Sequence, residues 1–149
     1  MREAIGGTWL FTIVIVFIVL FSSYLAFSVN YAKAFKVKNS IISTIEYCGN
    51  LSEASQIEVS KNLNEIGYYV YSNCESSESP YDTNNAGKAK YCVSKKTSKG
   101  SLNKSYYKVR VFFRLDLPIL GEIFTFPVTG ETKALVNADD ISGTCARTR

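Results

Sequence analysis

The run from Trp9 to Val29, WLFTIVIVFIVLFSSYLAFSV, constrains this chain most, because no other stretch of it is apolar for so long. No charged residue interrupts the sequence between Glu3 and Lys33. As a helix, this uncharged stretch would span about 43 Å, which is more than the ~30 Å hydrocarbon core of a bilayer requires. The sequence therefore predicts a transmembrane helix over residues 8–30, preceded by a short leader or cytoplasmic stub over residues 1–7.

The rest of the chain, residues 31–149, has the size of one small domain. It is fairly polar and rich in tyrosine. Arg2 and Glu3 cancel, so the formal net charge of +4 belongs to this part. A charge of this size predicts mild affinity for anionic surfaces and does not indicate a nucleic-acid-binding protein.

The membrane helix is expected to continue as an amphipathic helix over residues 31–48 and to end at Gly49 and Asn50. Apolar residues recur there every three or four positions, and polar residues occupy the other face. Such a stripe packs against other helices or against the chain's own sheet, and both partners remain open. The predicted helix-packing residues are Tyr31, Phe35, Ile41 and Ile45.

Shorter elements follow. Ser52 is a suitable N-cap for a second helix that ends at Gly67. The polar stretch from Glu75 to Lys90 is expected to be a long surface loop. Strands are predicted over residues 68–71, 91–93 and 109–116. Residues 123–128 and 133–136 are predicted to form one further strand or a pair of strands, with the break at Pro127 or at residues 129–132. The predicted fold class is α+β, with a long transmembrane helix that continues as an amphipathic helix and packs on a small antiparallel sheet.

Four cysteines are present, none of them in a CxxC pair, and the chain contains no histidine. Their spacing does not match a zinc site, so disulfides are the better interpretation, and these indicate an oxidising, extracytoplasmic location. Three pairings are possible. We favour Cys74 with Cys92, across the long loop, and Cys48 with Cys145, from the long helix to the C-terminal tail.

The charges that flank the membrane segment point the other way. Lys33, Lys36 and Lys38 follow it and only Arg2 precedes it, so the positive-inside rule alone would place the C-terminal domain in the cytoplasm. We give the cysteines more weight and predict a single-pass protein with a cytoplasmic N-terminus. A signal peptide cleaved after Ser28 is an alternative.

The sequence offers little for catalysis. Without histidine, a serine or cysteine nucleophile lacks its usual base, and the adjacent Asp139 and Asp140 resemble a solvated turn more than a metal site. There is no glycine-rich phosphate loop. We predict that the chain is not an enzyme and has no cofactor, metal or small-molecule substrate.

A cluster of lysines could bind an anionic polymer, since tyrosines flank it and no acidic residue falls within it. The simpler interpretation, a solvated loop between strands, is favoured. The candidate residues of this patch are Lys88, Lys90, Lys95, Lys96, Lys99 and Lys104.

The stretch GTWLFTIVIVFIVLFSSYLAFSVNYAKAFKVKN, with GYYVYSNC and RLDLPILGEIFTFPVTGET as weaker support, resembles the type IV pilin superfamily. The likeness is to the TadE-like minor pilins of tight-adherence pili. It implies a pilin-like fold and prepilin processing between Gly7 and Thr8. Thr12 then stands at the fifth mature position, where the family usually has glutamate.

The resemblance implies a minor pilin or pseudopilin, a structural subunit of a bacterial surface pilus or secretion apparatus. Its partners would be the lipid bilayer, other pilin-like subunits and pilus assembly proteins. The alternative is a single-pass anchor that holds a binding or adhesion module at the cell surface and does not assemble into a filament.

Overall fold

A computed structural model of the chain describes residues 2–98, 104–116, 123–136 and Cys145. One long helix, α1 (Arg2–Cys48), runs through the whole molecule, and a small α+β head gathers on its C-terminal half. The head contains α2 (Glu53–Ile66) and the strands β1 (Ser79–Thr83), β2 (Ala89–Ser98), β3 (Lys104–Asp116), β4 (Ile123–Glu131) and β5 (Leu135–Val136). The predicted α+β class and the continuous helix are confirmed.

Local signals in the sequence account for both helix ends. Gly49 follows α1 with a φ of 73°, a conformation that favours glycine. The Ser52 side chain accepts a hydrogen bond from the Ser55 amide at the start of α2. At its other end, Gly67 adopts the left-handed conformation, and the Tyr68 amide donates to the Leu63 carbonyl at 3.0 Å. The predicted bounds of the second helix are confirmed.

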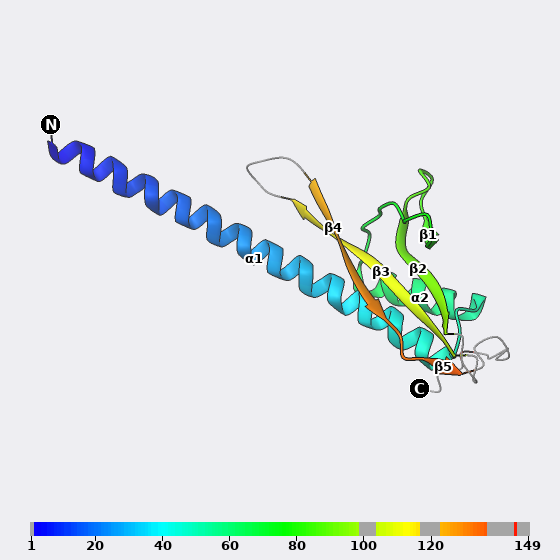
Figure 1. Ribbon diagram of the computed structural model, residues 1–149. Coiled ribbons are helices and arrows are strands. Elements are labelled where there is room, and N and C mark those ends of the chain that lie inside the picture. Colours follow the sequence, from blue (N-terminus) through cyan, green and yellow to red (C-terminus); the bar gives the residue numbers. More distant parts are fainter. Residues whose placement is uncertain (1, 99–103, 117–122, 137–144, 146–149) are drawn as a thin grey trace.

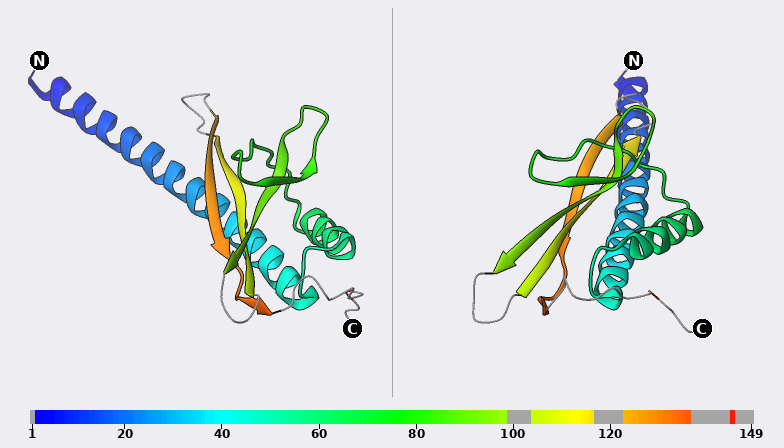
Figure 2. Two further views of the ribbon diagram at one scale, coloured as in Figure 1. Left: turned by 45° about the vertical axis from the view of Figure 1, so that its right-hand side comes forward. Right: turned by 90° about the vertical axis from the view of Figure 1, so that its right-hand side faces the viewer.

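The sheet is antiparallel, with strand order β1-β2-β3-β4, and β5 pairs with the start of β3 on the side that β4 occupies further along. The β3–β4 hairpin crosses α1 obliquely and is directed toward the N-terminal side of the molecule (Figures 1 and 2). Pro127, the expected interruption, lies inside β4 opposite Phe112. β4 forms the edge of the sheet there, where a missing amide hydrogen is tolerated.

The core lies between one face of the sheet and the two helices. β3 supplies its alternate residues Val109, Val111 and Phe113, as their spacing predicted. Gly130 on β4 lies so close to α1 that a Cβ atom there would come within 2.7 Å of the Ile42 side chain. The remaining buried core residues are Ala34, Val37, Ile41, Ile45, Val59, Leu63, Tyr68, Tyr91, Val93 and Tyr107.

Two predicted elements are wrong. Residues 68–71 form no strand, and only an isolated bridge between Ser72 and Ala89 follows them. The stretch from Glu75 to Lys90 is not one loop, because it contains β1 and a tight turn into β2. In that turn, the Asn84 side chain accepts hydrogen bonds from the amides of Ala86 and Lys88. An asparagine can thus close a hairpin inside a stretch whose polarity resembles that of a loop.

Two disulfides hold the head together, Cys74–Cys92 and Cys48–Cys145, with Cα–Cα distances of 5.7 and 5.2 Å. These are the pairings that the sequence favoured. The first links the segment before β1 to the middle of β2. The second fixes the end of α1 to the C-terminal part of the chain, of which Cys145 is the described residue.

Candidate functional site

The N-terminal half of α1 extends clear of the head (Figure 1). Its most apolar 18-residue window has a mean hydropathy of 2.6, and none of it is buried against the described part of the chain. Large apolar side chains point outward around the whole helix, from Trp9, which is 72% exposed, to Val29, which is 67% exposed. By length and composition this helix could cross a membrane.

Two aromatic residues of α1, Phe27 and Tyr31, contact the head through Phe113. The Phe27 and Phe113 rings meet edge to face with centroids 5.4 Å apart, and Tyr31 approaches Phe113 in the same way at 5.8 Å. Tyr31 and Phe35, two of the predicted packing residues, remain 44% and 43% exposed. Part of each ring is therefore available to a partner outside the chain.

Ile41 and Ile45 lie elsewhere. They are 1% and 0% exposed, inside the core between α1 and the sheet. The sequence left two partners open for this stripe, other helices or the chain's own sheet. At Ile41 and Ile45 the partner is the chain's own head, which covers both side chains. Helix periodicity predicts which residues share a stripe and does not reveal what covers it.

The predicted processing site lies within the first turns of α1. Gly7 and Thr8 are both helical, and the Thr12 hydroxyl donates to the Thr8 carbonyl at 3.0 Å. The Thr12 hydroxyl thus has its hydrogen-bond acceptor within its own helix. A cut between Gly7 and Thr8 stays a prediction.

The lysine cluster does not form one surface. Lys88 is exposed in the β1–β2 turn, and Lys95 and Lys96 are neighbours on β2, so their side chains leave opposite faces of the sheet. Lys104, across from Ser98, shares the face of Lys96. Lys99 lies outside the described residues.

Lys90 does not belong to an exposed patch. It is 4% exposed, and its Nζ lies 2.8 Å from an Asp82 carboxylate oxygen and 3.3 Å from the Asn64 side-chain oxygen. Asp82 has a φ of 50°, in the left-handed region that aspartate tolerates better than most residues. Lys90 is therefore a structural cation that links β2 to α2 and the end of β1.

The same region forms a groove that sequence patterns did not indicate. An open depression of about 810 Å³ lies between α2 and the β1–β2 hairpin. Tyr81 forms part of its wall and stacks on Tyr91 with a centroid distance of 5.4 Å, and burial raises the pKa of both phenols. The other lining residues are Glu53, Gln56, Ile57, Ser60, Lys61, Asn64, Glu65 and Asp82. Ligand-binding pockets combine aromatic surface with a few polar groups, as this groove does, so the groove is a second candidate site.

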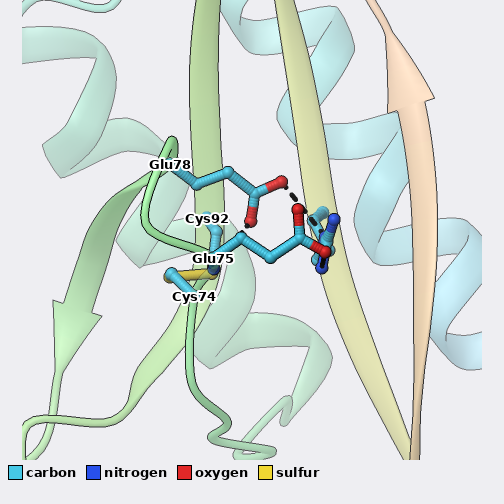
Figure 3. Close-up of polar contacts among 5 residues, drawn as sticks. Cys74, Glu75, Glu78 and Cys92 are labelled. Carbon is cyan, nitrogen blue, oxygen red and sulfur yellow. Dashed lines mark hydrogen bonds and ion pairs between the residues drawn. A yellow bond between two sulfur atoms is a disulfide. The ribbon is translucent and has the colours of Figure 1, made fainter.

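Arg110 on β3 forms ion pairs on the opposite side of the sheet with Glu75 and Glu78, the two carboxylates labelled in Figure 3. Its guanidinium lies 2.6 Å from a Glu75 oxygen and 3.1 Å from a Glu78 oxygen. The hydrogen bond from Arg110 and its charge hold the pKa of Glu75 below the ordinary value. Next to these carboxylates, the Cys74–Cys92 disulfide joins the same segment to β2. The cluster therefore fixes the segment before β1 onto the sheet.

No metal site is formed by histidine, cysteine, aspartate and glutamate in the part of the chain that the structure describes. Asp139 and Asp140 lie outside that part. Comparison of the chain with known protein families, with curated proteins and with solved structures found no match.

Proposed function

We propose that the chain is a membrane-anchored, pilin-like structural subunit of a bacterial surface pilus or secretion apparatus. The observation that carries the proposal is the division of α1 into an apolar half clear of the head and a half built into the head. A subunit that assembles through its helix needs such a free half, together with a head that folds without it.

The two disulfides support an extracytoplasmic head, because such bonds persist in oxidising surroundings. In this arrangement the N-terminus is cytoplasmic and residues 8–30 cross the bilayer. The lysines after the span then meet lipid headgroups on the outer side, a position that their long side chains accommodate.

The proposal is tested by purifying the tagged full-length chain from its native membranes in mild detergent. We expect other subunits with a long apolar N-terminal helix to co-purify. Leu20→Ser, on the exposed half of α1, should reduce their yield, whereas Ile57→Ser, on the exposed face of α2, should not. Extraction at high pH checks that the Leu20→Ser chain is still inserted in the membrane. If no other subunit with a long apolar N-terminal helix co-purified with the unaltered chain, the proposal would be contradicted.

A second function is favoured by the groove between α2 and the β1–β2 hairpin. In it, the chain is a single-pass anchor, and the groove binds a ligand at the cell surface without assembly into a filament. The two functions make different predictions, since Leu20→Ser leaves ligand capture by the groove intact. Substitution of Tyr81 would abolish capture and leave co-purification unchanged.

A further inference from the structure

An exposed patch of aromatic rings lies where α1 leaves the head, between one face of the helix and one face of the β3–β4 hairpin. Three of the rings come from α1 and two from β4, and each is between 38% and 44% exposed. We call this patch the aromatic collar. Its members are Phe27, Tyr31, Phe35, Phe124 and Phe126.

The collar is one connected structure, because Phe113 lies at its centre. Besides its edge contacts with Phe27 and Tyr31, the Phe113 ring stacks on Phe126 with centroids 5.3 Å apart. Phe124 continues the row along β4, 6.4 Å from Phe126. Two segments far apart in the sequence thus present their rings next to one another. The first residues of β4 lie on the side of the head that faces the N-terminal half of α1 (Figure 2).

We propose that the aromatic collar lies in the headgroup layer of the bilayer, so that β4 dips into the membrane surface and the head does not stand clear of it. This inference rests on the proposed membrane span. Trp9 and Phe27 are 18 residues apart, a rise of about 27 Å along a helix and close to the ~30 Å hydrocarbon core. With Trp9 at one boundary, the collar falls at the other, where tryptophan and tyrosine concentrate in membrane proteins and where the phenylalanines of interfacial segments insert.

The charges beyond the collar fit this position. Lys36 is exposed on α1 just after Tyr31, and Lys38 lies over the Phe35 ring at 4.1 Å from its centroid. Lys33 is exposed too, with one of its three ammonium hydrogens donated to the Gly67 carbonyl at 2.7 Å. Lipid phosphates lie at the same depth as the outer part of an aromatic belt and attract such a cluster of lysines. A second copy of the chain would bring the same positive charges to the contact. The bilayer surface is therefore the occupant that matches both the rings and the charges.

The test uses fluorescence quenching of single tryptophans in the full-length chain, reconstituted in vesicles of zwitterionic and anionic phospholipid. The lipids carry bromine on the acyl chain, either near the headgroup or near the chain end. Phe126→Trp in a Trp9→Phe background reports on the collar, and Ile57→Trp in the same background is the matched control on exposed α2. The unaltered chain, with Trp9, reports on the span. Phe124→Trp provides a second reporter in case Phe126→Trp does not fold.

We expect the collar tryptophan to be quenched several-fold more strongly by shallow bromine than by deep bromine, and the Ile57→Trp reporter to be unaffected by either. If shallow and deep bromine quenched the collar tryptophan equally weakly while Trp9 was quenched, the collar inference would be overturned and the membrane span would stand. A collar tryptophan that becomes shielded from quenching only as the protein density in the vesicles rises would overturn it too, because a second copy of the chain would then cover the collar. If Trp9 were also unquenched, the membrane span itself would fail.

Discussion

The Tyr68 hydroxyl bridges the main chains of β2 and β3. It donates to the Phe112 carbonyl at 2.6 Å, accepts from the Phe112 amide at 2.9 Å and lies 3.3 Å from the Lys90 carbonyl. The regular pairing of β2 with β3 ends at Tyr91 and Val111, one residue earlier. A side chain from the link after α2 thus satisfies main-chain groups that the ladder leaves open, and burial raises the pKa of its phenol.

Removing this bridge should destabilise the head. Tyr68→Phe leaves the Phe112 amide and carbonyl buried without their partner, which costs about 1–3 kcal/mol each when no water replaces it. We expect chemical unfolding of the full chain in detergent to show a loss of at least about 1 kcal/mol. Tyr69→Phe, at a neighbouring residue that is 64% exposed, is the control and should change little. Equal stability of the two variants would contradict this role of Tyr68.

The buried stripe of α1 gives a second prediction. Ile45→Ala removes a side chain that is 0% exposed, and such truncations cost about 2–5 kcal/mol. Ile57→Ala, where the isoleucine is 65% exposed, should cost less than about 0.5 kcal/mol. Both values come from chemical unfolding. If Ile45→Ala lost co-purifying subunits without losing stability, Ile45 would contact a partner and not the head's own core.

The Lys90–Asp82 pair gives a third prediction. Asp82→Asn keeps a side chain that tolerates the left-handed backbone but removes the charge beside a buried lysine, with an expected loss of about 2–3 kcal/mol. The double variant with Lys90→Met removes both charges and should be more stable than Asp82→Asn alone. Thermal unfolding of the unaltered chain, the two single variants and the double variant measures this. A double variant less stable than either single variant would mean that the pair itself contributes little.

Stability should depend on acid through Glu75. Its pKa is depressed in the folded chain by the hydrogen bond and charge of Arg110, so its contribution is complete above the ordinary pKa and is lost as the pH falls through the folded value. The difference in melting temperature between the unaltered chain and Glu75→Gln should therefore shrink from pH 7 toward pH 3. Glu65→Gln, at an exposed carboxylate on α2, is the control. A constant difference would contradict the contact.

Much of the architecture could be predicted because it depends on local sequence. The apolar run fixes the first half of α1, Gly49 and Gly67 terminate the helices, and the alternation around Val111 identifies β3. Other features arise from contacts between distant residues, which local patterns do not encode. The run of tyrosines from Tyr68 to Tyr71 has strand composition, yet Tyr68 is drawn into the sheet as a hydrogen-bonding bridge. Asn84 closes a hairpin that polarity concealed.

The candidate sites were less predictable for the same reason. Lys90 belongs to a lysine-rich stretch and is buried only because Asp82 and Asn64 meet it from other elements. Ile41 and Tyr31 lie on one amphipathic stripe, but the sheet covers the first and leaves the second partly exposed. The groove and the aromatic collar each combine segments whose proximity exists only in the fold.

The proposed function requires that the exposed half of α1 packs against the helices of other subunits. Photo-crosslinking in living cells tests it most directly, with a photoreactive amino acid placed in turn at each position of α1 from Leu10 to Val29 and, as controls inside the head, at Ile41 and Ile45. We predict adducts with other long-helix subunits at positions spaced three or four residues apart, and none at Ile41 or Ile45. An absence of protein adducts at every position, in cells where the chain is inserted and its disulfides have formed, would contradict the claim.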